Sequence, residues 1–409
     1  MNNSIKTKTT DFRVEDKFSK REINLSGSVI REILKVTERP DVISFAGGLP
    51  SPKGFPTTAL LNAFTKVLTE NPESALQYGP TEGYRPLREW IAQDFSKRGI
   101  KVDLDEVLIV SGSQQALDLL GKLFIDDGAK VLVESPSYLG ALQSFSVQTP
   151  HYETVQTDDQ GMIPADITAE KAKDARFIYA LPNFQNPTGI TMSLERRLEL
   201  VEICAKYGLP IIEDDPYGEL RFEGEHLPSL LELGRHAGAT VIRMGSFSKI
   251  LAPGLRLGFV IAPAEVINKM VQLKQATDLH TQTVSQMAVY EAIKDNFFEQ
   301  HLPAVRDLYR QQCQFMLDAL SEHFPENSKW TRPTGGMFIW ASLPEHIDTA
   351  AILPQVVEQC KVAYVPGMPF YTDHNKAPKN NLRLSFVTVE EDKIKEGISS
   401  LGKFIKNLS

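Results

Sequence analysis

The chain has 409 residues, which is enough for about two or three domains with a large hydrophobic core. Its 42% hydrophobic and 23% charged residues are ordinary for a globular enzyme, and its net charge of -8 argues against nucleic acid or an anionic membrane as the main partner. The three cysteines are far apart, and no segment is apolar enough for a signal peptide or a membrane span. We therefore expect a cytoplasmic protein with no disulfide framework and no metal site.

Near the N-terminus, residues 26–35 predict a short helix. Ser26 is a helix-capping residue, and apolar residues follow it at helical spacing. Arg31 lies off this apolar stripe, which is typical of a solvated helix face. Nothing in the local pattern assigns Arg31 another role.

Turn residues dominate the next segments. A short strand beginning at Ile43 runs into Gly47 and Gly48, which indicates that the backbone approaches another group closely there, with a simple turn as the alternative. Tyr78 lies in a loop before a helix that we predict from about residue 85 to residue 98. A tyrosine in such a loop is usually a packing residue.

Short strands alternate with helices over residues 106–262. The apolar and β-branched runs lie at 107–110, 131–133, 177–180, 210–212, 240–244 and 257–262, and the helical patterns at 114–125, 138–147 and 193–207. This alternation predicts an α/β fold with a mostly parallel sheet that helices cover on both faces. Ligands of such sheets bind at the carboxyl ends of the strands.

Polar and aromatic side chains follow the predicted strands where they end. The small-residue loop at 111–117 opens a helix whose N–H groups and dipole suit a phosphate, and the loop after the next strand brings the ring of Tyr138. Asn186 follows a third strand, and Asp214 and Asp215 end a fourth. Each loop is ordinary by itself. Together they favour a planar phosphorylated cofactor.

A lysine, Lys249, lies in the turn between the last two predicted strands. The hydroxyls of Ser246 and Ser248 and the guanidinium of Arg256 surround it in the sequence, a grouping that suits a phosphate. A lysine beside a phosphate site predicts a Schiff base with a phosphorylated aldehyde cofactor. The alternative is a buried lysine paired with a carboxylate.

Beyond residue 262 the pattern indicates a smaller α+β domain. Helical segments lie at 264–275, 283–295, 298–324, 348–359 and 390–406, and strand-like runs at 335–340, 362–366 and 382–386. Arg383 alternates with apolar residues on the last of these strands, so it projects on the face opposite to Leu382 and Leu384. An arginine facing water from an edge strand is the alternative.

These motifs, in their order and spacing, resemble the pyridoxal-phosphate aminotransferases of fold type I, over nearly the whole chain from Ser26 to Leu408. The motifs are Asn-Pro-Thr-Gly at 186–189, Asp214 with Tyr217 three residues later, Ser-Phe-Ser-Lys at 246–249, and Arg383. The branch of 2-aminoadipate and kynurenine aminotransferases is the most similar, on the segments 45–50, 76–78 and 112–116 and on Arg256 seven residues after Lys249.

The resemblance implies pyridoxal 5'-phosphate as the cofactor and assigns it a set of residues. Lys249 forms the Schiff base and later carries the substrate's α-proton, and Asp214 lies against the pyridine nitrogen; strand alternation lets only one of Asp214 and Asp215 reach the ring. The other implied cofactor contacts are Tyr217 and Asn186 at the phenolic oxygen, Tyr138 on the ring face, and Ser113, Gln114, Ser246, Ser248 and Arg256 at the phosphate.

The resemblance also implies substrate contacts, a homodimer and a domain division. Arg383, with Asn186 and the Gly48 backbone, binds the substrate α-carboxylate, and Arg31 recognises its distal end. Tyr78 reaches the cofactor phosphate of the neighbouring subunit. We expect an N-terminal arm and short helix at 1–45 that belong to the small domain, a large cofactor domain at 46–300 and a small domain at 301–409.

The implied activity is ping-pong transamination from an L-amino acid of the 2-aminoadipate, aromatic or branched-chain type to a 2-oxo acid such as 2-oxoglutarate. A lyase or decarboxylase of the same fold is the first alternative, because it uses the same lysine and acid. A cofactor-binding sensor without turnover is the second. The same domain is also found fused to a DNA-binding module in bacterial regulators, but we expect no such module in the short N-terminal segment.

Overall fold

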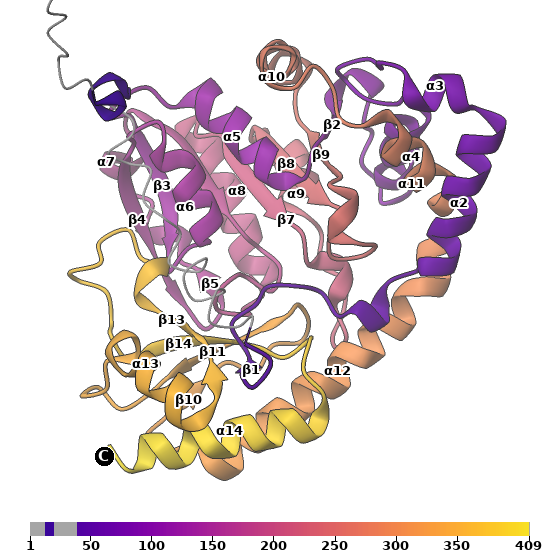
Figure 1. The fold of residues 1–409 in the computed structure, drawn as a ribbon. Coiled ribbons are helices and arrows are strands. Elements are labelled where there is room, and N and C mark those ends of the chain that lie inside the picture. The colour runs from indigo at the N-terminus through magenta and orange to yellow at the C-terminus, as the bar shows by residue number, and fades with distance from the viewer. Residues whose placement is uncertain (1–12, 20–38, 409) are drawn as a thin grey trace, which may run out of the picture.

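The computed structural model describes residues 13–19 and 39–408 (Figure 1). Arg31 and the predicted helix at 26–35 lie outside the described residues. Within the described part of the chain, no helix is long and apolar enough to cross a membrane.

The largest element is a mixed sheet with the strand order β2-β9-β8-β7-β6-β3-β4-β5. Its strands are β2 (Val107–Val110), β3 (Lys130–Ser135), β4 (His151–Asp158), β5 (Gly161–Met162), β6 (Ala175–Ala180), β7 (Ile211–Asp215), β8 (Val241–Ser246) and β9 (Gly258–Ile261). The pairs from β8 through β7, β6 and β3 to β4 are parallel, whereas β9 is antiparallel to both neighbours. The prediction of a mostly parallel sheet is confirmed.

Helices cover both faces of this sheet because its strands are apolar on both faces. In β3, Val131 and Val133 belong to one core cluster and Leu132 to the other, and all three are fully buried. Helices α5, α6 and α10 pack in the first cluster, and α8, α9, α4 and α11 in the second (Figure 1). The sequence marks the ends of α8 well, because Ser193 caps its first turn and Gly208 ends it at φ +62°.

The α-helices of the described residues are α2 (Thr57–Glu70), α3 (Pro72–Leu76), α4 (Arg85–Lys97), α5 (Ser113–Phe124), α6 (Leu139–Ser146), α7 (Ala169–Ala172), α8 (Leu194–Tyr207), α9 (Leu230–Ala237), α10 (Ala264–Thr277), α11 (Thr283–Ile293), α12 (Phe297–His323), α13 (Thr349–Cys360) and α14 (Glu391–Lys406). Short 3-10 helices are η1 (Val14–Lys17), η3 (Pro52–Gly54), η4 (Leu104–Glu106), η5 (Pro164–Asp166), η6 (Gly218–Leu220), η7 (Pro253–Leu255) and η8 (Met368–Phe370).

A second, antiparallel sheet has the order β10-β11-β14-β13. Its strands are β10 (Lys329–Trp330), β11 (Phe338–Ser342), β13 (Val365–Pro366) and β14 (Asn381–Ser385). Because β14 lies between two neighbours, Arg383 is on an interior strand and is almost completely buried. The alternative of an edge-strand arginine facing water is therefore wrong.

The chain from the N-terminal side joins this second region through a short parallel pair. Strand β1 (Ile43–Ser44) pairs with β12 (Val362–Ala363), and the Phe45 carbonyl accepts a hydrogen bond of 2.8 Å from the Ser385 amide. Residues 46–48 therefore leave β1 beside β14 and run toward the large sheet.

Candidate active site

A cavity of about 350 Å³ opens where the large sheet's parallel strands end. Among the described residues, it collects every one that the resemblance assigned to the cofactor or substrate except Tyr78. These are Gly48, Ser113, Gln114, Tyr138, Asn186, Asp214, Tyr217, Ser246, Ser248, Lys249, Arg256 and Arg383. Residues from the whole length of the described chain thus meet in one place.

Asp214 presents an unpaired carboxylate oxygen in this cavity. Its Oδ2 accepts a hydrogen bond of 2.7 Å from the Tyr179 hydroxyl, whereas Oδ1 is buried and has no partner among the described residues. Burial is the main cause that raises the pKa of Asp214 from 3.8 to about 7. A buried acceptor without a donor is unfavourable, so this oxygen is suited to a protonated ring nitrogen.

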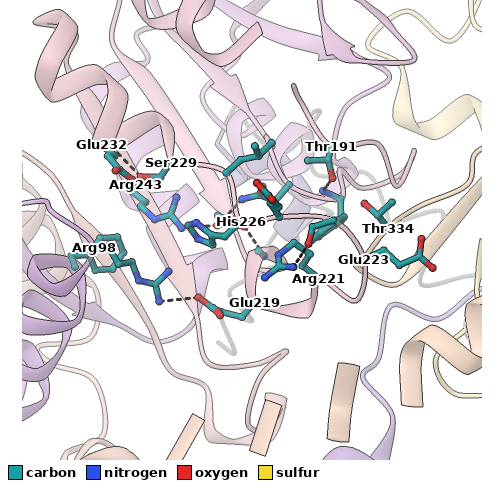
Figure 2. Close-up of a pocket in the computed structure, with 18 of the residues that line it drawn as sticks. Arg98, Thr191, Glu219, Arg221, Glu223, His226, Ser229, Glu232, Arg243 and Thr334 are labelled. Carbon is teal, nitrogen blue, oxygen red and sulfur yellow. Dashed lines mark hydrogen bonds and ion pairs between the residues drawn. The ribbon is translucent and has the colours of Figure 1, made fainter. Parts of the chain in front are cut away.

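The neighbouring acid, Asp215, points to the other face of β7. Arg243 joins Asp215 and Glu213 there, with both N–O distances at 2.6 Å. Burial alone would raise the pKa of Asp215, but the Arg243 guanidinium lowers it overall. Asp215 and Arg243 border a second cavity of about 240 Å³, and Figure 2 shows Arg243 on its wall with Arg98, Glu219 and His226. The strand thus places Asp214, and not Asp215, in the first cavity.

Lys249 faces the same cavity as Asp214. Its Nζ donates a hydrogen bond of 2.6 Å to the carbonyl oxygen of Gly48. Burial, together with the positive charges of Arg383 and Arg256, lowers the pKa of Lys249 from 10.5 to about 8. Among the described residues it forms no ion pair with a carboxylate, so the alternative of a carboxylate-paired lysine is not observed.

Small residues make room for a phosphate beside Arg256. Gly112 has φ +83°, and a Cβ atom added there would lie 2.6 Å from Arg256 Nη2. Ser113 begins α5 directly afterwards, so the free N–H groups of a helix N-terminus face the same space as the guanidinium. The hydroxyls of Ser246 and Ser248 complete this side, and the Ser246 hydroxyl accepts the Ser248 amide at 3.2 Å.

Gln114 and Tyr138 lie next to this phosphate side. The Gln114 amide donates to the Gly140 carbonyl oxygen at 3.1 Å. A Cβ atom added to Gly140 would lie 2.5 Å from the Tyr138 ring, so the ring rests on a position without a side chain. Tyr138 borders the cavity with a pKa that burial raises to about 12, so its hydroxyl is neutral.

The opposite wall of the cavity contains a buried arginine, Arg383, whose hydrogen-bond donors are not all paired. Arg383 donates to Asn186 Oδ1 and to the Ala46 carbonyl oxygen, each at 2.8 Å, while its Nε has no partner among the described residues. The Phe338 ring lies under its guanidinium, 4.2 Å away. Asn186 also lies 3.4 Å from the Tyr217 hydroxyl. This wall suits a planar carboxylate, which matches the paired donors of arginine.

One predicted residue that the structure describes, Tyr78, does not line the cavity. Tyr78 is 78% exposed, and its ring lies edge-on to the ring of His280. Tyr78 is therefore not a core residue of the single chain, which was the alternative to a role at a neighbouring subunit. Arg31 lies outside the described residues.

Three contributors were not found by sequence reasoning. The sequence pattern indicates Tyr179 only as a strand residue, although its hydroxyl donates a hydrogen bond to Asp214. Phe338 and the Ala46 carbonyl oxygen, which hold Arg383, were also missed. Alternation along β6 places Tyr179 on a known face, but only the order of strands in the sheet brings it beside Asp214.

The fold and this cavity define a transferase that uses pyridoxal 5'-phosphate. The unpaired Asp214 oxygen fits the ring nitrogen, the space at Gly112 fits the phosphate, and Lys249 fits the aldehyde. Residues 41–401 also match the family model "Aminotransferase class I and II".

Known proteins support the same assignment over nearly full length. The chain is 46% identical to the 2-aminoadipate transaminase of Thermus thermophilus, with 96% of this chain and 97% of that protein covered. The solved kynurenine aminotransferase of Pyrococcus horikoshii is 42% identical with a TM-score of 0.91, covering 97% of this chain and 98% of that one. A solved alpha-aminoadipate aminotransferase of Thermus thermophilus, in complex with N-(5'-phosphopyridoxyl)-L-leucine, is 43% identical with a TM-score of 0.90, covering 97% and 99%.

This chain belongs to the class I and II aminotransferases. It is an enzyme, a transaminase of amino acids that depends on pyridoxal 5'-phosphate.

Proposed function

We propose that the enzyme transfers the amino group of 2-aminoadipate, aromatic or branched-chain L-amino acids to a 2-oxo acid such as 2-oxoglutarate, in a ping-pong reaction. The names of its relatives support these donors, because they include a 2-aminoadipate transaminase, a kynurenine aminotransferase and a structure that holds a leucine adduct. The observation that carries the proposal is Arg383, a buried cation with an unpaired Nε on the cavity wall.

The residues that line the cavity then have separate roles in the reaction. The bound cofactor supplies an electrophilic aldehyde and an electron sink. Asp214 holds a proton at the ring nitrogen through its unpaired oxygen, and Tyr217 and Asn186 bind the phenolic oxygen. Lys249, with its lowered pKa, is neutral often enough near pH 8 to accept a proton at Nζ.

The remaining residues bind and orient. Arg383 fixes the substrate carboxylate, with help from Asn186 and the Gly48 backbone, so that the substrate's α-carbon stays near Lys249. Tyr138 packs against the ring face. The proposed phosphate contacts are Ser113, Gln114, Ser246, Ser248 and Arg256, all of which line the cavity.

The proposal includes a homodimer with shared active sites. Leu61 and Leu76, on α2 and α3, are 64% and 73% exposed in the single chain, and Tyr78 follows them. Apolar side chains gathered in one region support an interface there. We place the neighbour's phosphate against Tyr78.

Three further points belong to the proposal. The domains divide at about residues 45 and 300, and the pairing of β1 with β12 supports assigning residues up to 45 to the small domain. Free thiols at Cys204, Cys313 and Cys360 support a reducing cytoplasmic location. Arg31 recognises the distal carboxylate of acidic substrates, so Arg31→Gln slows 2-aminoadipate and glutamate selectively.

A panel of single amino acids tests the reaction. Each is mixed with the cofactor-loaded enzyme, and absorbance follows conversion of the bound aldehyde to the amine form. An aminotransferase converts stoichiometrically and releases the matching 2-oxo acid. Turnover of a donor without an oxo-acid acceptor would favour a lyase or decarboxylase instead, and no conversion with any donor would favour a sensor.

A further inference from the structure

A buried lysine, Lys274, lies outside the active-site cavity, in the last turn of α10. Its side chain is fully buried, and Nζ donates to both carboxylate oxygens of Asp278 at 2.9 Å. A third bond, of 2.7 Å, goes to Gln115 Oε1 on α5. The ammonium thus joins two helices.

The same cluster fixes the loop that opens α5. Gln115 Oε1 also accepts the Ser111 amide at 2.8 Å, and Gln115 Nε2 donates to Asp278 at 2.7 Å. The Ser111 hydroxyl donates to Asp278 and meets the Thr281 hydroxyl, each at 3.2 Å. Ser111 is therefore held at both its amide and its hydroxyl.

This loop leads directly to the proposed phosphate contacts. Gly112 follows Ser111 in the left-handed conformation that brings the backbone against Arg256, and Ser113 and Gln114 come next. A shift at Ser111 would therefore turn the N–H groups of α5's first residues away from the position they share with Arg256.

Stability alone does not account for this arrangement. Lys274 is fully buried and Asp278 is 28% exposed, and desolvation of the lysine offsets much of their attraction, so the pair contributes little net stability. The bonds of Lys274 to Asp278 and Gln115 instead define how these side chains lie relative to one another. Burial alone would raise the pKa of Asp278, yet the hydrogen bonds from Gln115 and Lys274 lower it overall, so the carboxylate is charged.

We propose that Lys274 is a positioning residue for the cofactor phosphate: through Gln115 and Asp278 it holds the loop at 111–114 in its phosphate-binding conformation. This inference rests on the proposed phosphate site. It assigns Lys274 no contact with the cofactor.

The test compares two ligands that differ only in the phosphate. Apoenzyme is titrated with pyridoxal 5'-phosphate and with pyridoxal, and inorganic phosphate is used as a competitor. Lys274→Met should raise the Kd for pyridoxal 5'-phosphate and for inorganic phosphate about tenfold, the loss of roughly one charged hydrogen bond. The Kd for pyridoxal should stay within about twofold, because the lysine and ring contacts are intact.

Control variants make the result specific. Lys269→Met changes an exposed lysine of the same helix, whose Nζ donates to Gln272 Oε1 at 3.2 Å, and should leave all three Kd values unchanged. Gln115→Met breaks the cluster from the less buried side and should reproduce the effect if Lys274→Met folds poorly. The double variant should be no worse than the stronger single one, because both remove the same support.

Two results would overturn the inference: equal losses for pyridoxal and its phosphate, which mean a general loss of structure, and no loss for either. A wild-type enzyme that binds pyridoxal as tightly as its phosphate would instead show that the proposed phosphate site itself is wrong.

Discussion

Tyr179 donates its hydroxyl to one carboxylate oxygen of Asp214 across 2.7 Å, and the other oxygen of Asp214 has no partner among the described residues. The pair comes from adjacent strands, β6 and β7. The protein thus supplies a donor to one oxygen of this carboxylate and none to the other, and Asp214 lines the cavity.

Asp214 should make the apoenzyme less stable as pH rises. Its pKa is about 7 when folded against 3.8 ordinarily, so its contribution is complete below about pH 4 and lost as pH rises through 7. Asp214→Asn removes this pH dependence. The unfolding free energy of the variant, relative to that of the wild type, should therefore grow with pH by the order of 4 kcal/mol, at about 1.36 kcal/mol per pKa unit. Urea unfolding of both apoproteins at a series of pH values measures the two unfolding free energies. If they changed with pH in parallel, the prediction would be contradicted.

Tyr179→Phe should weaken cofactor binding. The Tyr179 hydrogen bond lowers the pKa of Asp214, so its loss raises that pKa further and reduces the charged fraction that pairs with a protonated ring nitrogen. We expect a Kd for pyridoxal 5'-phosphate about tenfold higher at neutral pH, from one charged hydrogen bond. Tyr364→Phe is the matched control, because Tyr364 is equally buried and donates across the same 2.7 Å, to Thr349. Equal losses of cofactor affinity in the two variants would contradict a specific role for the hydrogen bond between Tyr179 and Asp214.

Recombination of apoenzyme with pyridoxal 5'-phosphate should report the titration of Lys249. Only the neutral amine attacks an aldehyde, so the rate should rise with pH around a midpoint of about 8, well below the ordinary 10.5. The charge of Arg383 lowers this pKa, so Arg383→Gln should move the midpoint upward. Stopped-flow absorbance follows the rate. A midpoint near the ordinary lysine pKa of 10.5 would mean that Lys249 is not buried in this way in solution.

Arg383→Lys should lower kcat/KM about 100-fold or more for every amino donor. Lysine retains the charge but loses the paired donors, and each charged hydrogen bond contributes about 1.5–3 kcal/mol. Steady-state kinetics with one acidic and one apolar donor measure the loss. Arg332→Lys, an exposed arginine of the same region, is the control. A loss confined to the acidic donor would move Arg383 from the α-carboxylate to the side chain of the substrate.

Mixed dimers test the shared active site. Tyr78→Phe and Lys249→Ala subunits are each expected to be nearly inactive alone. A hybrid of the two contains one site with Lys249 from the first chain and Tyr78 from the second, so tagged hybrids should recover activity. Hybrids no better than either parent would rule out sharing.

Sequence patterns located the elements that bury regular apolar stripes. The helices predicted at 193–207 and 390–406 lie at Leu194–Tyr207 and Glu391–Lys406; the apolar period locates both, and Ser193 and Gly208 also mark the ends of the first. Strand β4 was missed, since only Val155 among its residues is buried and the rest carry no apolar alternation. Helix α2 was also missed; it buries only Ala63 and Val67 in the single chain.

The residues of the site also fall into those that the sequence could predict and those that it could not. Lys249 and Asp214 stand next to strands whose ends the sequence reveals, so their meeting in one cavity was predictable from parallel-sheet geometry. The contacts of Arg383 with Ala46 and Phe338 were not, because they depend on how two sheets meet. No local pattern carries that information.

The bond between Arg383 and the Ala46 carbonyl oxygen joins positions 337 residues apart. On the ribosome, the two walls of the cavity are therefore made at different times. A nascent chain that has reached residue 262 already contains Lys249, Asp214 and Arg256, but the strand that carries Arg383 emerges only with the last thirty or so residues. Newly made chains thus contain Lys249, Asp214 and Arg256 before Arg383 has been synthesised. A protein truncated before β14 would keep the lysine and lose the arginine that binds the substrate carboxylate.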